Sequence, residues 1–166
     1  AISDRSLFDL IASGKAKEHL LEIITTCITL KKQFVEVDEF DTGSRMALNF
    51  GHTFGHAIEK EFHYSGFSHG MGVASGMSMI TALSEKYRMT APGSAQKLRD
   101  CLTKNGLPIT ADICNEHLID YSLVDKKSSS SGIKIILLKE IGEYYICPLS
   151  REQYVQFVKG DYRYEG

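Results

Sequence analysis

Four of the six histidines of this chain lie within an 18-residue stretch, and three of them, His52, His56 and His69, have the spacing and setting for chemistry. His52 and His56 are four residues apart, so on an α-helix they share one face with their Cβ atoms about 6 Å apart. His69 follows a glycine-containing turn that can fold it back toward the first pair. Neutral imidazoles from adjacent helices suit a divalent metal such as zinc, which binds them at about 2.0–2.1 Å. The spacing therefore indicates a metal site, a site of proton transfer, or both.

The histidine spacing alone leaves other interpretations open, because two histidines four apart also occur on helices that bind no metal. Gly51 and Gly55 each cost about 1 kcal/mol of helix stability relative to Ala. A helix that keeps both is expected to approach a ligand or another segment of the chain closely. Thr53 stands where the zincin protease motif H-E-x-x-H requires Glu, so that class is not supported. If His56 is a base rather than a ligand, a carboxylate or histidine from elsewhere must complete the three protein ligands of a catalytic zinc.

Polar and basic residues flank the histidines. Asn49 lies one turn before His52 and near the same helix face, and Glu59 lies about one turn beyond His56, where polar groups can orient the rings. Lysines at helix ends and in loops are usually solvated. Together with an arginine they can instead form an anion pocket for phosphate or carboxylate. The basic residues concerned are Lys31, Lys32, Arg45, Lys126 and Lys127.

The hydrophobic pattern predicts one mainly α domain over residues 1–166, a helical bundle with a small β-hairpin near the C-terminus. Polar stretches at 38–45 and 125–132 read as loops, and Ser150 with Gln153 forms a capping box before a closing helix. The other helices are expected at about 7–11, 16–37, 48–62, 71–88, 94–104 and 112–123, and the hairpin strands at 133–138 and 143–147.

Composition narrows the class of protein. Hydrophobic residues make up 43% of the 166 residues and charged residues 24%, which predicts a packed core. Nineteen basic and 21 acidic residues argue against a nucleic-acid binder.

No apolar run reaches the roughly 18 residues of a membrane span, and no signal peptide is evident, so we expect a cytoplasmic protein without a membrane partner. The four cysteines form no C-x-x-C pair, which predicts reduced and mostly buried thiols. Neither G-x-G-x-x-G nor a P-loop occurs, and the first residue is not Met, which suggests a piece of something longer.

The segment from Arg45 to Glu59, RMALNFGHTFGHAIE, is followed by SHG and a helix rich in small residues. This combination resembles the signature of the 3-dehydroquinate synthase family and its sugar-phosphate cyclase relatives. The resemblance continues in Asp38 and Glu39 before Arg45, in GLP at 106–108 and in DKK before a hairpin containing IG. It covers essentially the whole chain, and it corresponds to the C-terminal, helical half of the family's enzyme.

The resemblance implies a role for each matching residue. His52 and His69 would be two of three ligands of zinc or cobalt, and His56 would take part in proton transfer. The third ligand, a glutamate, and the NAD-binding α/β domain would lie upstream of Ala1, so the NAD would be bound mainly by a part that this chain lacks. Lys31 and Arg45 would act with His56 in catalysis, and the substrate would be contacted by Lys31, Arg45, Asn49 and one or both of Lys126 and Lys127.

The implied reaction is a lyase-type cyclisation of the shikimate pathway. A phosphorylated keto acid, 3-deoxy-arabino-heptulosonate 7-phosphate, becomes 3-dehydroquinate and phosphate through transient oxidation by NAD, phosphate elimination, reduction and aldol closure. The full-length enzyme would be a homodimer, and the chain alone is expected to be inactive. Met71 replaces a usual Glu and Ser75 a usual apolar residue. Three alternatives remain open: a related sugar-phosphate cyclase, a metal-dependent polyol dehydrogenase, which the R-x-x-L-N-F-G-H block argues against, and a helical interaction module with incidental histidines.

Overall fold

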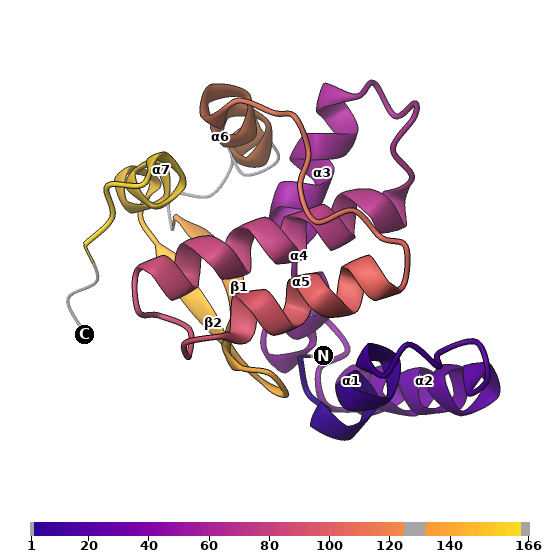
Figure 1. The fold of residues 1–166 in the computed structure, drawn as a ribbon. Helices are drawn as coiled ribbons and strands as arrows, with labels where there is room; N and C mark the ends of the chain where they lie inside the picture. The colour runs from indigo at the N-terminus through magenta and orange to yellow at the C-terminus, as the bar shows by residue number, and fades with distance from the viewer. Residues whose placement is uncertain (1, 125–131, 164–166) are drawn as a thin grey trace.

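The computed structural model describes residues 2–124 and 132–163, and it is mainly helical with one two-stranded hairpin (Figure 1). The predicted fold class is therefore confirmed. The elements are α1 (Arg5–Ala12), α2 (Leu20–Val37), the 3-10 helix η1 (Ser44–Asn49), α3 (His52–Glu61), α4 (His69–Lys86), α5 (Ser94–Lys104), α6 (Asn115–Val124), β1 (Ile133–Glu140), β2 (Glu143–Leu149) and α7 (Arg151–Lys159).

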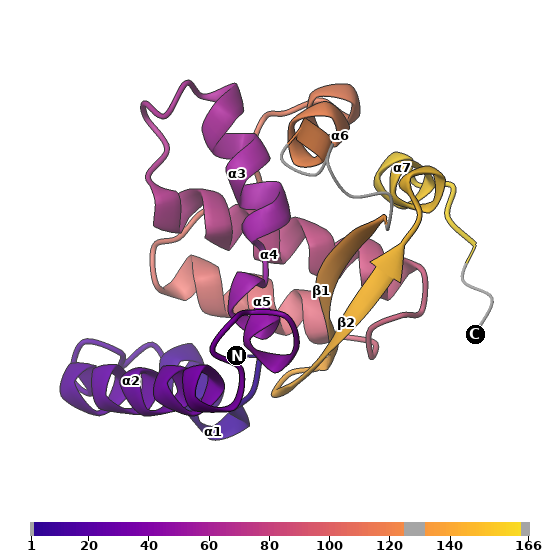
Figure 2. The same ribbon diagram turned by 180° about the vertical axis from the view of Figure 1, so that it is seen from behind.

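Helix α4 runs through the middle of the fold, with α3, α5 and strand β1 packed against it (Figures 1 and 2). Strands β1 and β2 are antiparallel, with Ile135 opposite Cys147. The apolar run of β1 is almost entirely buried, and α7 closes the core with Tyr154 and Phe157, both without exposed surface. The predicted capping box is present, because the Ser150 side chain accepts from the Gln153 amide and the Gln153 side chain bonds back to Ser150.

Glycines set the distance between α3 and α4. A Cβ at Gly76 of α4 would overlap the carbonyl oxygen of Gly51, and one at Gly55 of α3 would lie 3.1 Å from the Cα of Val73. These distances leave no room for larger side chains at the crossing. The close approach expected from the glycines is therefore made by another helix of the same chain.

The helix expected over 48–62 is interrupted in the structure. Residues 44–49 form η1, and Gly51 adopts a left-handed conformation, with φ of +78°, immediately before α3 begins. This conformation is strained for any residue with a Cβ, so the first glycine of the pattern, Gly51, has a structural cause. As a consequence Asn49 does not share a helix face with His52, contrary to the expectation from spacing.

Helix α2 lies beside α1 at the edge of the fold (Figures 1 and 2). It begins at Leu20 rather than near residue 16, and none of its residues is buried. Leu21 is 80% exposed and Ile28 64% exposed. The expectation of mostly buried cysteines is half right: Cys101 and Cys147 are buried, whereas Cys27 on α2 and Cys114 are exposed. Within the described residues, no helix is long and apolar enough to cross a bilayer.

Candidate metal and substrate site

The fold brings the three neighbouring histidines together at the start of two helices. His52 is the first residue of α3, His56 lies one turn further, and His69 is the first residue of α4. The ring centroids are 5.6 Å apart for His52 and His56, 5.3 Å for His52 and His69, and 5.7 Å for His56 and His69. The side chain of Ser68 caps α4 by accepting from the Met71 amide, which fixes where His69 leaves the turn.

Each imidazole of this trio has an acceptor at its Nδ1 atom. The two oxygens of Glu59 lie 2.9 Å from Nδ1 of His56 and 3.0 Å from Nδ1 of His69. The Phe50 carbonyl oxygen lies 3.3 Å from Nδ1 of His52. A carboxylate or carbonyl oxygen only accepts, so the hydrogen-bond network assigns the proton of each neutral ring to Nδ1 and leaves Nε2 unprotonated. Metal-binding histidines in proteins characteristically have such a partner on the other nitrogen.

The electrostatics of the site favour an ionised Glu59 and a neutral His52. Burial acts to raise the pKa of Glu59, but the hydrogen bonds and charges of His56 and His69 outweigh it and hold this pKa below the ordinary value. Burial lowers the pKa of His52, the neighbouring histidines lower it further, and the Phe50 carbonyl only partly opposes them. A neutral His52 keeps its lone pair available to a metal ion.

Two sets of metal-binding atoms are conceivable at this point. His56, Glu59 and His69 can each offer one atom, and the three atoms lie within 4.8 Å of one another. Both oxygens of Glu59, however, already accept from imidazole nitrogens. We therefore assign Glu59 as the acceptor that orients two of the rings, and the imidazole Nε2 atoms as the atoms that fit a metal ion.

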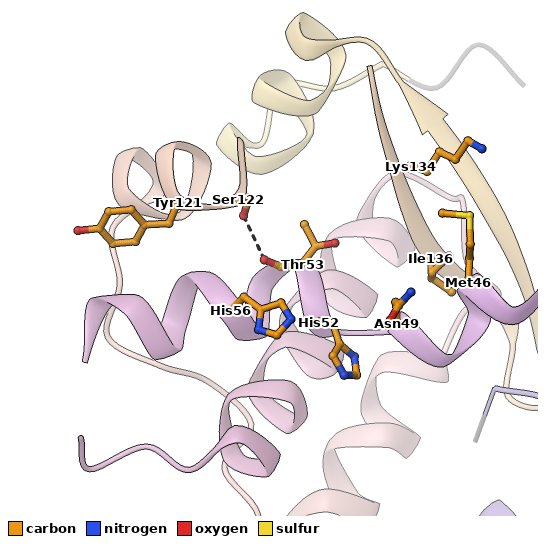
Figure 3. Close-up of a pocket in the computed structure, with 9 residues that line it drawn as sticks. All are labelled: Met46, Asn49, His52, Thr53, His56, Tyr121, Ser122, Lys134 and Ile136. Carbon is orange, nitrogen blue, oxygen red and sulfur yellow. Dashed lines mark hydrogen bonds between the residues drawn. The ribbon is translucent and has the colours of Figure 1, made fainter. Parts of the chain in front are cut away.

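A pocket of about 240 Å³ adjoins the histidines, between α3, α6 and β1 (Figure 3). Ser122 of α6 closes one side, since its hydroxyl donates to the Thr53 carbonyl oxygen at 3.2 Å. Lys134 extends from β1 along the opposite side, and its amine points away from the rings in Figure 3. Among the residues that the structure describes, no acidic side chain lines the pocket, which suits an anionic ligand. The lining residues are Met46, Asn49, His52, Thr53, His56, Tyr121, Ser122, Lys134 and Ile136.

The family model for the 3-dehydroquinate synthase C-terminal domain matches residues 1–128. The chain belongs to this family. It is 40% identical over 164 residues to the 3-dehydroquinate synthase of Clostridium acetobutylicum, covering 96% of this chain and 46% of the relative. It is 39% identical over 163 residues to that of Enterococcus faecalis V583, covering 95% and 46%. The chain thus spans about half the length of these curated relatives.

Two solved structures share the fold of this chain over most of its length. The 2-epi-5-epi-valiolone synthase of Streptomyces hygroscopicus subsp. jinggangensis 5008, with NAD+ and Zn²⁺ bound, has a TM-score of 0.78 at 14% identity and covers 96% of this chain and 46% of its own. A 2-deoxy-scyllo-inosose synthase complexed with carbaglucose-6-phosphate, NAD+ and Co²⁺ has a TM-score of 0.66 at 20% identity, covering 85% and 42%. At such low identities the likeness establishes the fold.

The residues that the family resemblance assigns to the substrate are only partly brought together. Asn49 lines the pocket from η1, with its amide donating to Asp41 at 3.2 Å. The guanidinium of Arg45 instead donates to the Glu39 carbonyl oxygen at 2.6 Å, and Arg45 does not line the pocket. Lys31 is exposed on α2 and does not line the pocket either. Lys126 and Lys127 lie outside the described residues.

Sequence reasoning missed two features of this family member's site. Lys134 was not expected there, although a lone lysine inside the apolar run IKIILL is a signal that one position of the strand meets solvent or a ligand. The bond from Ser122 to α3 was also missed, because it joins residues 69 positions apart. Nothing in the sequence around Ser122 predicts that its hydroxyl bonds the backbone of α3.

Proposed function

We propose that this chain is the metal- and substrate-binding half of a 3-dehydroquinate synthase. The observation that carries the proposal is the trio of histidines, whose ring centroids are 5.3–5.7 Å apart and whose Nδ1 atoms each have an acceptor. They lie beside a pocket that no acidic side chain lines within the described residues. The family match and relatives about 40% identical support the reaction of 3-deoxy-arabino-heptulosonate 7-phosphate to 3-dehydroquinate and phosphate. The NAD-binding half belongs upstream of this chain, and we propose that the chain alone is inactive.

His52 and His69 are the residues that would hold the metal ion, zinc or cobalt, with a third ligand from the upstream half. Related cyclases were crystallised with Zn²⁺ or Co²⁺ and NAD+, which supports both groups for the whole enzyme. When bound, the metal supplies Lewis acidity that polarises an alcohol or carbonyl oxygen of the substrate. The neutral imidazole nitrogens described above are the donors this chemistry requires.

His56 is the proposed proton carrier. It lines the pocket, and Glu59 holds its Nδ1–H, so Nε2 is the atom that accepts a proton from the substrate and returns it. An ionised Glu59 also stabilises the imidazolium that forms while the proton is held.

Binding of the anionic substrate is assigned to the basic and amide groups around the pocket. Asn49 and Lys134 line it, and their donors suit phosphate or carboxylate oxygens. Lys31, Arg45, Lys126 and Lys127 remain proposed substrate contacts on the family resemblance. For Arg45 this requires the bond to the Glu39 carbonyl to break when substrate binds.

A second candidate, a cyclase acting on another sugar phosphate, is favoured by one observation. Met71, two residues after His69 in the first turn of α4, stands where the family usually has Glu. An uncharged thioether there changes what surrounds the proposed metal ligand.

The test joins this chain to the upstream half of the Clostridium acetobutylicum relative and measures phosphate release from the seven-carbon keto-acid phosphate. We expect turnover in the joined protein, none in the chain alone, and losses of at least about 10³-fold in His52→Ala and His56→Ala. Turnover that survives both substitutions would refute the proposed site. Turnover of only other sugar phosphates would favour the second candidate.

A further inference from the structure

Glu59 is a buried carboxylate shared by two histidines. Its side chain is 10% exposed, while those of His56 and His69 are 56% and 57% exposed. Oε2 accepts from His56, on the same helix, and Oε1 accepts from His69, on the next helix. A buried carboxylate is stable only when its oxygens are hydrogen-bonded, and here each oxygen has its own imidazole.

The sharing of one carboxylate dictates where two protons lie. An ionised carboxylate has no proton to donate, so His56 and His69 must both donate from Nδ1. A neutral imidazole in water carries its proton mostly on Nε2, the opposite arrangement. In their neutral forms both rings are therefore held in the less common tautomer, and both depend on the same side chain.

We infer that Glu59 is a positioning residue that sets the tautomer of His56 and His69 together, so that one carboxylate prepares both the proposed proton carrier and a proposed metal ligand. The roles of the two histidines rest on the proposed function, whereas the tautomers follow from the hydrogen bonds alone. The acceptor at Nδ1 favours the tautomer in which each ring presents the lone pair of Nε2.

The glutamine variant separates this role from simple packing. In Glu59→Gln the amide oxygen accepts from one ring, but the amide nitrogen donates and needs an acceptor on the other. One of the two rings must then move its proton to Nε2, although the side chain keeps its shape. We expect long-range ¹H–¹⁵N NMR of the metal-free chain to show both rings protonated at Nδ1 in the wild type and only one in the variant. We also expect a 10–100-fold loss of zinc affinity, the usual effect of losing such a partner.

The same helix provides a matched control. Glu61 accepts from Nδ1 of His117 at 2.9 Å, in a pair that lies outside the trio and the pocket. Glu61→Gln removes the same charge, but its amide oxygen can still accept from the one ring it serves, so the tautomer of His117 and the zinc affinity should both stay unchanged. A shared loss of affinity in both variants would show a general effect of charge and would overturn the inference.

Two further results would overturn it. The first is a wild-type spectrum with either ring protonated at Nε2, which needs no variant to fold. The second is a Glu59→Gln protein that keeps both Nδ1 protons yet loses zinc binding more than about 10³-fold, because Glu59 would then be a ligand itself. The tautomer is read without substrate or turnover, so failure of the proposed reaction leaves this test intact.

Discussion

Replacing Gly76 by Ala should destabilise the chain by forcing α3 and α4 apart. The new Cβ would overlap the Gly51 carbonyl oxygen and lie 2.8 Å from the Gly55 amide nitrogen. Both are backbone atoms, so no side chain can rotate away. Overpacking of this kind costs about 1–3 kcal/mol, and removing a glycine from a helix returns about 1 kcal/mol. Because backbone atoms must move, we take the upper part of the range and expect a net loss of about 2 kcal/mol, or roughly 30-fold in the folding constant.

The assay is urea unfolding of the metal-free chain, with Gly70→Ala as the control. Gly70 lies on the same helix, and a Cβ there would meet nothing within 4 Å. The control should therefore be neutral or more stable by up to about 1 kcal/mol. A Gly76→Ala chain as stable as the control would refute the account of the α3–α4 contact. Wider helix spacing should also separate His52 from His69, so zinc affinity should fall in the variant.

The remaining predictions concern the surface, the pocket and the metal. Leu21→Lys and Ile28→Lys on α2 should each change the free energy of unfolding by less than about 0.5 kcal/mol, measured by urea unfolding, because both side chains are largely exposed. Lys134→Gln in the joined enzyme should raise KM for the phosphorylated substrate about 5-fold and leave kcat unchanged. The reason is that about 1 kcal/mol of electrostatic attraction to the substrate is lost at a solvated site. An unchanged KM would show that Lys134 does not bind the substrate. Zinc at 100 times its Kd should raise the free energy of unfolding by about 2.7 kcal/mol. Either EDTA or the substitution His52→Ala should abolish this stabilisation. Thermal unfolding at several zinc concentrations measures both effects.

The sequence predicts those features of the fold that depend on neighbours along the chain. The hairpin at 133–149 follows from a run of apolar residues, a turn and a second run, and the last helix follows from Ser150 and Gln153. The meeting of His52 with His56 follows from helical spacing alone. These signals are local, so no knowledge of packing is needed to read them.

Long-range packing accounts for what the sequence does not predict. Residues 48–62 look like one helical run, yet the chain turns at Gly51 because the backbone there must lie against α4. Lys134 meets the histidine pocket only because β1 packs against α4 and η1. Arg45 matches the family motif, but its guanidinium bonds a backbone carbonyl in its own loop, and sequence similarity does not report that state.

The glycines of α4 and the carboxylate of α3 form a single arrangement. A Cβ at Gly72 would lie 3.2 Å from Cγ of Glu59, so the absence of a side chain there leaves space for the carboxylate between the helices. Helices at ordinary spacing, about 8–10 Å between axes, depend on larger side chains at their contact. With such side chains Glu59 could not reach His69 while still bonding His56. The glycines therefore lower the stability of α4, but they leave the space in which the buried carboxylate of Glu59 accepts hydrogen bonds from His56 of α3 and His69 of α4.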